Sequence, residues 1–132
     1  MDLEILKIAS ANDHNKYIKN CTHQSKLKNP LCGDEIQINL IIENDKILNF
    51  GYQGKSCIYC QASANLLSKI SINKKITKIN ELCIDANYFF EGNNEIIKKK
   101  WKFMQRLFKA KNQARKECIL LPFKALKKIV SN

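Results

Sequence analysis

Two runs of alternating apolar and polar residues, joined by a short polar turn, constrain the fold of this 132-residue chain more than any other feature. Glu35 to Glu43 places Ile or Leu at every second position, which predicts a half-buried β-strand. Asn44-Asp45 are residue types that tolerate the positive φ of a tight hairpin. Ile47 to Gln53 is then the returning strand. We expect three of its residues to share one face: Leu48, Phe50 and Tyr52.

The remaining apolar patterns add one strand and several helices. Cys21 to Lys28 predicts a weak edge strand, in which Lys and Gln would blunt edge-to-edge pairing. Helical spacing predicts helices at Asp2–Ala11, from Ile58 onward, at Ile76–Leu82, at Glu95–Lys109, and from a start between Cys118 and Leu121. Two of these helices carry an apolar stripe: Ile97, Trp101, Met104 and Phe108 in one, and Ile119, Phe123, Leu126 and Val130 in the last.

Strands followed by helices indicate the α+β class. We expect a small antiparallel sheet of about three strands with helices packed on one face, in a single domain spanning 1–132. The expected helix caps are Asp2, Thr77 and Asn94. Pro122 is best tolerated in the first turn of the last helix.

The start of the chain, its apolar runs and its cysteines indicate the cellular compartment. The chain begins Met1-Asp2-Leu3-Glu4, which is acidic where a secretory signal would be basic. No apolar run approaches the ~18 residues of a membrane span. We therefore expect no signal peptide, no membrane association and a cytoplasmic location. In a reducing cytoplasm, six cysteines are more often metal ligands or reactive thiols than disulfides.

The formal net charge of +11 raises the question of nucleic-acid binding. The basic residues are not interleaved with aromatics, and no nucleic-acid motif is present, so we expect no nucleic-acid partner. The basic excess is concentrated between Lys98 and Lys128. That stretch predicts docking to an acidic protein.

Three thiols and one carboxylate lie at the edges of predicted elements. Pro30 and Gly33 favour a turn in which Cys32 and Asp34 can point toward one centre. Cys57 stands where a strand ends and a helix begins, and Cys118 precedes the last helix. Thiolates suit zinc, Cu(I) and iron–sulfur clusters, whereas a carboxylate is a harder donor that holds such centres less firmly. These residues predict a metal site that is easily emptied; the alternative is a set of unrelated cysteines.

The other cysteines and the histidines carry weaker signals. Cys57-Ile58-Tyr59-Cys60 is a C-x-x-C that reads as a redox pair, as half a zinc site, or as one ligand followed by a spare thiol. We favour the last interpretation. Cys83 follows an apolar stretch and is expected in the core. No spacing pairs Cys21 with a partner, and the histidines, His14 and His23, are expected at the surface.

At these residues the chain resembles a known family. Three segments carry the resemblance to the U-type iron–sulfur cluster scaffold family (IscU, SufU and the N-terminal domain of NifU): Asn29-Pro30-Leu31-Cys32-Gly33-Asp34, Cys57 with Gln61-Ala62-Ser63-Ala64, and the stretch from Ala114 to Leu126 around Cys118. The resemblance implies a SufE/NifU-like fold. It also implies that Cys32, Asp34, Cys57 and Cys118 hold zinc, iron or a [2Fe–2S] cluster.

By resemblance, the chain is a carrier rather than an enzyme. It receives sulfur from a SufS-like cysteine desulfurase, which it can also activate, and it passes its cargo to apo iron–sulfur proteins, as a monomer or a weak dimer. Two departures point to the SufU branch. Glu117 stands where IscU has a histidine, and the Leu-Pro-Pro-Val-Lys chaperone motif is not found.

The sequence also suggests an order of sulfur acceptance. Cys32 lies in a surface loop and is the expected first acceptor, with Cys118 second. We expect tight packing to hinder Cys57, and Arg115 and Lys116 to favour the Cys118 thiolate. The alternative function is a structural zinc-binding module that docks an acidic protein through the Lys98–Lys128 surface.

Overall fold

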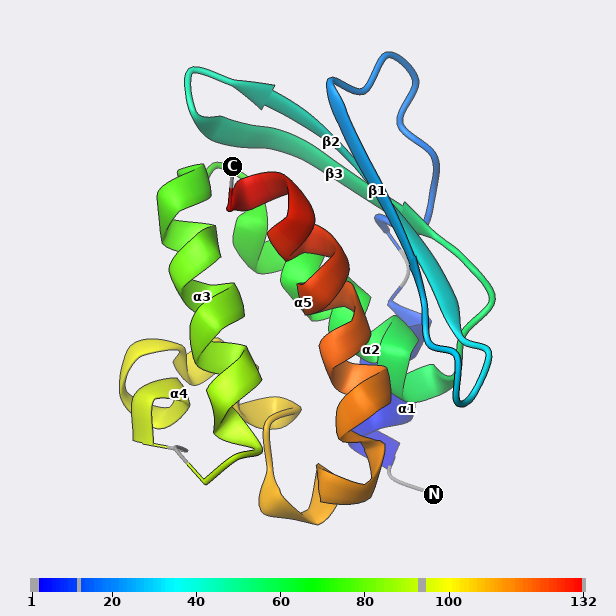
Figure 1. Cartoon of the computed structure of the whole chain (residues 1–132), viewed down its shortest axis with the longest axis vertical. Helices are drawn as coiled ribbons and strands as arrows, with labels where there is room; N and C mark the ends of the chain where they lie inside the picture. Colours follow the sequence, from blue (N-terminus) through cyan, green and yellow to red (C-terminus); the bar gives the residue numbers. More distant parts are fainter. Residues whose placement is uncertain (1–2, 12, 93–94, 132) are drawn as a thin grey trace.

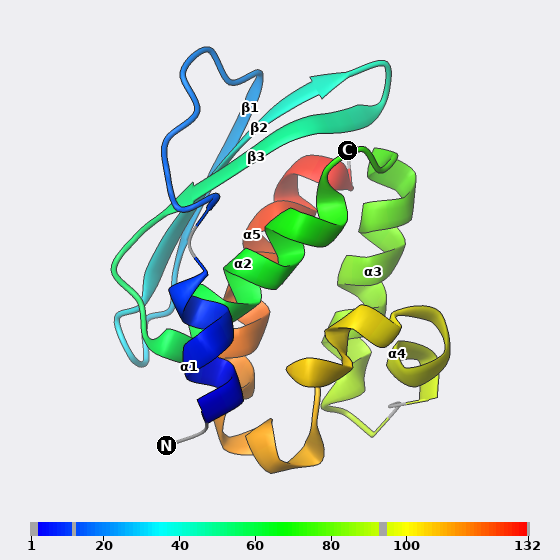
Figure 2. The same cartoon turned by 180° about the vertical axis from the view of Figure 1, so that it is seen from behind.

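The predicted α+β architecture is confirmed. The computed structural model describes residues 3–11, 13–92 and 95–131. Its elements are α1 (Leu3–Ser10), β1 (His23–Lys28), β2 (Glu35–Glu43), β3 (Lys46–Gln53), α2 (Ile58–Ser71), α3 (Ile76–Phe89), α4 (Glu95–Lys100), the 3₁₀ turns η1 (Lys102–Arg106) and η2 (Ala110–Arg115), and α5 (Lys116–Val130). The strands form an antiparallel sheet in the order β1-β2-β3, and the helices lie on one face of it (Figures 1 and 2). None of the described helices has the length and apolarity that crossing a membrane requires.

The hairpin forms where predicted, with one shift of register. Asn44 and Asp45 adopt φ values of 54° and 62°, as a tight turn requires. An irregularity between Ile41 and Ile42 changes the pairing with β3. The prediction that Leu48 shares the buried face is therefore wrong, because Ile47 takes the inner position and Leu48 is 41% exposed. Phe50 and Tyr52 are buried as expected.

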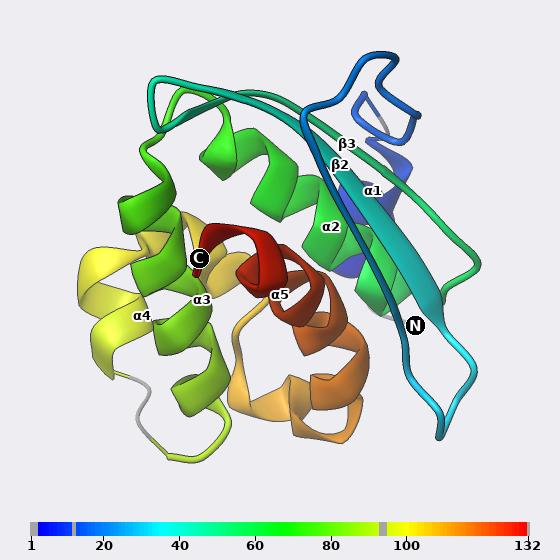
Figure 3. The same cartoon turned by 45° about the horizontal axis from the view of Figure 1, so that its top comes forward.

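Helices α2 and α5 form the layer next to the sheet, and α3 packs against the far side of α5 (Figure 3). The small side chains of α2 allow this close approach, and Ala62 and Ala64 are fully buried. The predicted inner face of α5 is confirmed, since its four residues are buried: Ile119, Phe123, Leu126 and Val130. Cys83 lies in the core, as expected.

The outer face of the sheet is partly covered by the segment after α1. The backbone N–H of Ile18 donates to Asn39 Oδ1 at 2.7 Å, and Tyr52 N–H donates to the His14 carbonyl at 3.0 Å. Gly51 is required here, because a Cβ would lie 2.4 Å from the Lys16 carbonyl oxygen. Asn39 is therefore buried although the alternation of the sequence places it on the polar face.

The boundaries of α3 and α5 differ from the sequence predictions. Helix α3 continues to Phe89 rather than ending at Leu82, and Lys75, not Thr77, is its N-cap. Helix α5 begins at Lys116, so Pro122 lies inside the helix and not in its first turn. This proline is tolerated because the carbonyl that loses a partner belongs to Cys118, near the start of the helix. The expected caps Asp2 and Asn94 lie outside the described residues.

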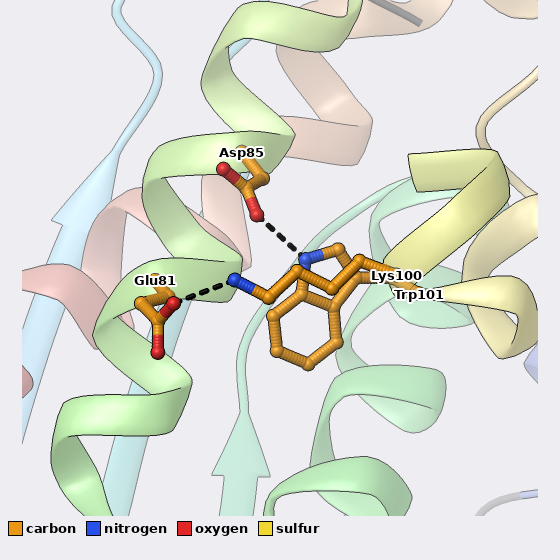
Figure 4. Close-up of polar contacts among 4 residues, drawn as sticks. All are labelled: Glu81, Asp85, Lys100 and Trp101. Atoms are coloured by element: carbon orange, nitrogen blue, oxygen red, sulfur yellow. Dashed lines mark hydrogen bonds and ion pairs between the residues drawn. The ribbon is translucent and has the colours of Figure 1, made fainter. Parts of the chain in front are cut away.

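The predicted helix Glu95–Lys109 is broken after Lys100. The chain turns at Trp101 (φ −127°, ψ 54°) and continues as η1. The predicted apolar stripe is still buried, so the break changes the direction of the chain while the same side chains face the core. Trp101 Nε1–H donates to Asp85 Oδ2 at 2.7 Å, and Lys100 Nζ lies 2.6 Å from Glu81 Oε1 (Figure 4). These contacts with α3 override the local helical preference.

Candidate metal centre

The loop that carries Cys32 is closed by its own hydrogen bonds. Gly33 N–H donates to the Asn29 carbonyl at 2.8 Å, and Asn29 N–H donates to the Asp34 carbonyl at 2.7 Å. Asn29 Oδ1 accepts the Leu31 N–H at 3.0 Å. Gly33 has φ 79°, a conformation that favours glycine. The loop joins β1 to β2 and leaves the Cys32 side chain exposed, with Asp34 half-buried behind it.

The exit of β3 is held against the start of β2. Glu35 N–H donates to the Lys55 carbonyl at 2.9 Å. Gly54 makes this approach possible, because a Cβ there would lie 2.0 Å from the Glu35 carbonyl oxygen. Cys57 follows as the N-cap of α2, as predicted, and its N–H donates to Asp34 Oδ2 at 3.4 Å. The antiparallel hairpin thus brings the segment of Cys57 to the loop of Cys32.

The four residues that the resemblance implies as ligands lie at one end of the molecule. The turn after β1 and the starts of α2 and α5 lie together there (Figures 1 and 2). Ligand atoms of Cys32, Asp34 and Cys118 lie within 4.8 Å of one another. Cys57 is outside this tight group, but it lies close enough to Cys118 to raise the pKa of that thiol. A tetrahedral zinc with ligands at about 2.3 Å separates its sulfurs by roughly 3.8 Å, so a modest contraction would suffice.

The proposed ligands make it harder for Cys118 to lose its proton. Burial raises the pKa of Cys118, and the hydrogen bond with Cys57 and the charges of Cys57, Asp34 and Cys32 raise it further. Each anion therefore makes the next deprotonation harder. A bound cation would reverse this effect by compensating the negative charge. The donor set fits a thiophilic metal.

A sequence model described as the NifU-like N-terminal domain matches residues 8–90. This chain belongs to the NifU-like N-terminal domain family. The match includes Cys32, Asp34 and Cys57 and ends before Cys118. The U-type resemblance seen in the sequence is thereby confirmed.

Two curated relatives cover nearly all of this NifU-like chain. The iron–sulfur cluster assembly scaffold protein IscU of Thermotoga maritima is 30% identical over 124 residues, which cover 93% of this chain and 87% of the relative. An uncharacterised protein of Borreliella burgdorferi is 32% identical over 130 residues, covering 94% and 84%. Both alignments extend well beyond the segment that the family model matches.

Solved structures share the fold of this NifU-like domain. A protein of Fervidobacterium islandicum, described as an iron–sulfur cluster assembly scaffold for the SUF system, superimposes with a TM-score of 0.88 at 23% identity, covering 98% of this chain and 96% of the other. A NifU-like N-terminal protein of Brucella abortus gives a TM-score of 0.79 at 16% identity, covering 98% and 91%.

Two expectations about the thiols are wrong. Of the four proposed ligands, Cys118 is the buried one, with 8% of its surface exposed, whereas Cys57 is half-buried, so tight packing does not hinder Cys57 most. The expectation that Arg115 and Lys116 favour a Cys118 thiolate is wrong, because burial and neighbouring anions raise its pKa. The Arg115 guanidinium lies over the Tyr59 ring, 5.4 Å from its centroid.

Cys60 lies deeper in the NifU-like domain than the sequence suggested. It is fully buried, and burial raises the pKa of its thiol to about 12. A hydrogen bond with Ser56 has the opposite, smaller effect on this pKa. The charges of Cys57, Asp34 and Cys32 raise this pKa as well. The C-x-x-C spacing was the only signal of this position in the sequence.

The remaining candidates lie outside the ligand group. Glu117 pairs with Lys124 at 3.4 Å and is exposed. His23 Nδ1 hydrogen-bonds to Thr22 Oγ1 at 2.8 Å, and the Cys21 thiol contacts Gln24 Oε1 at 3.8 Å.

Proposed function

We propose that this NifU-like domain is an iron–sulfur cluster assembly scaffold and sulfur acceptor. Its cargo is iron, zinc or a [2Fe–2S] cluster, held by Cys32, Asp34, Cys57 and Cys118. One observation supports this most directly: ligand atoms from two separate segments of the chain, the β1–β2 loop and α5, lie within 4.8 Å of one another. The N-terminus of α2 adds Cys57 beside them. The T. maritima relative, itself described as a scaffold, supports the same function.

The mixed donor set favours a cargo that can be released. Thiolates bind soft centres firmly, and the Asp34 carboxylate is a harder and weaker donor for them. Cys32 is exposed, so one side of the centre faces an incoming partner. These are properties of a carrier that must give up its metal, rather than of a closed structural site.

Cys32 is the proposed first sulfur acceptor, with Cys118 second. A desulfurase carries sulfur as a cysteine persulfide. The Cys32 sulfur attacks the outer sulfur of that persulfide, and the desulfurase cysteine leaves as its thiolate. Only an accessible thiol can meet the mobile cysteine of a partner. Cys32 is exposed and Cys118 is buried, which supports this order.

Metal content tests the site assignment. Zinc and iron are measured in the purified chain and in Cys57→Ser, with Cys83→Ser and Cys21→Ser as matched controls. We expect about one metal equivalent in the wild type and in both controls, and its loss in Cys57→Ser. Equal metal content in all four proteins would exclude the proposed site.

Anaerobic reconstitution separates the scaffold from the alternative, a structural zinc module. The chain is incubated with iron, cysteine and a desulfurase, and then with an apo iron–sulfur acceptor. A scaffold exchanges its metal, develops cluster absorption and activates the acceptor. Zinc that stays bound throughout would favour the structural module and refute the scaffold.

Peptide mapping tests the order of sulfur acceptance. After incubation with desulfurase and cysteine, mass spectrometry locates the added sulfur. We expect it on Cys32. Sulfur on Cys118 in Cys32→Ser, at the wild-type rate, would refute this order.

A further inference from the structure

Cys60 is a buried thiol at the metal centre that the proposed function leaves without a role. None of its surface is exposed, yet the charges of Cys57, Asp34 and Cys32 all act on it. Cys83 is the useful comparison. It is also buried, but Lys127 on α5 is the charged group that acts on it. Cys60 lies one helical turn into α2 from Cys57 and has no exposed surface, so a partner protein cannot reach it.

The start of α2 places Cys57 and Cys60 as a pair. Cys57 is the N-cap and Cys60 is the third helical residue. The Cys57 side chain makes no capping hydrogen bond to the first turn, so no such bond has to break before its thiol turns toward Cys60. Helical neighbours three residues apart have Cβ atoms about 5–6 Å apart, and a disulfide needs roughly 3.5–4.5 Å. The two Cβ atoms must therefore move closer to form a disulfide. Cys57 can make this movement because the N-cap lies outside the regular helix.

Cluster assembly at such a site also requires electrons, and the proposed function does not say where they come from. A persulfide delivers sulfur in the sulfane state, whereas a cluster contains sulfide. Each sulfur must therefore gain two electrons before it bridges iron. A pair of thiols supplies two electrons when it closes to a disulfide.

We propose that Cys57 and Cys60 form a dithiol that reduces sulfane sulfur held at this centre to sulfide. The inference rests on the proposed function, in that the site receives persulfide sulfur. Sulfur accepted at Cys32 first moves to Cys57: the Cys57 sulfur attacks the outer sulfur of the persulfide, and Cys32 returns to a thiol.

The reducing step is balanced within the chain. The Cys60 sulfur attacks the inner sulfur of the Cys57 persulfide, so the Cys57–Cys60 bond forms as the bond to the outer sulfur breaks. The outer sulfur leaves with the bonding electrons as hydrosulfide and takes up the Cys60 proton. The two cysteines are oxidised to a disulfide, and a dithiol reductant later returns them to thiols by attacking the half-buried Cys57 sulfur.

The surroundings of the pair fit these roles. Cys57 is half-buried and stands outside the tight group of Cys32, Asp34 and Cys118, so its thiol is not enclosed by the other three proposed ligands. Cys60 is shielded from external oxidants and can react only with a species bound at the site. It is a resolving thiol, and it is not required as a ligand.

A single-turnover experiment tests the step without a desulfurase. The reduced chain is loaded with glutathione persulfide, desalted without reductant, and assayed for free sulfide and for disulfides by peptide mass spectrometry. We expect about one sulfide per loaded Cys57 persulfide, together with a Cys57–Cys60 disulfide. Cys60→Ser should keep its persulfide and release about tenfold less sulfide, whereas Cys83→Ser should behave as wild type.

Several results would overturn the inference. Wild-type chain that retains its persulfide, or Cys60→Ser that releases sulfide at the wild-type rate, would do so. Equal loss of sulfide in Cys60→Ser and Cys83→Ser would indicate general damage to the core and no specific dithiol. A parallel loading with desulfurase and cysteine reports on the proposed function separately, because it asks only whether persulfide forms on the chain.

Discussion

Gly54 should be the most sensitive glycine in the chain, because it joins the hairpin to the metal centre. Its φ of 153° and its contact with Glu35 leave no room for a side chain. In Gly54→Ala the new Cβ would lie 2.0 Å from the Glu35 carbonyl oxygen, whereas ordinary van der Waals contact begins at 3.4 Å. The carbonyl is backbone, so the strand itself must move. Glu35 directly follows Asp34, and this movement reaches the proposed site.

The expected cost has two parts. Forcing a Cβ into positive φ costs about 1–2 kcal/mol. Overpacking a tight contact adds about 1–3 kcal/mol. We therefore expect Gly54→Ala to lose about 2–5 kcal/mol of the free energy of unfolding. Metal affinity should fall about tenfold or more, the usual effect of disturbing residues that position ligands.

Gly92→Ala is the matched control. Gly92 also has positive φ, at 104°, but no atom lies within 4 Å of a Cβ built there. It should lose only the conformational part, about 1–2 kcal/mol, and keep its metal affinity. Urea unfolding followed by the fluorescence of Trp101, the single tryptophan, measures stability. Competition with a chromophoric chelator measures zinc affinity. Equal stability and equal zinc affinity in the two variants would refute the argument.

Three further predictions follow from single contacts. Asp34→Ala should still bind metal but transfer it to an apo-acceptor about three- to tenfold more slowly, because it removes the hard, labile donor; faster transfer than wild type would contradict this. Trp101→Phe should cost about 1–3 kcal/mol of stability by removing the 2.7 Å hydrogen bond to Asp85, measured by circular dichroism in urea; an unchanged midpoint would contradict it. The metal-free chain should lose stability as pH rises above 9, because burial raises the pKa of Cys83 from 9.0 to about 12 in the folded state while the unfolded thiol ionises. Cys83→Ala should reduce that slope by about 1.4 kcal/mol per pH unit, and unchanged slopes would show that this thiol is not responsible.

Local patterns in the sequence were sufficient to predict the strands and to propose the composition of the centre. The alternation in β2 and the Asn44-Asp45 turn depend on the geometry of neighbouring residues, so they are readable without the fold. The starts of β2 and α2 follow from the same signals. They place Asp34 and Cys57 at adjacent ends of the hairpin, and the structure brings these segments together.

Tertiary contacts decided the rest. Trp101 breaks a helix because its indole reaches Asp85 on α3, and Asn39 is buried because a distant loop covers it. The depth of Cys118 and Cys60 depends on how α5 and α2 pack against the sheet. Exposure and the pKa of a thiol are set by every element around it, whereas sequence spacing records only its neighbours along the chain. The sequence therefore identified the thiols of the proposed centre, and only the fold determined which of them a partner can reach.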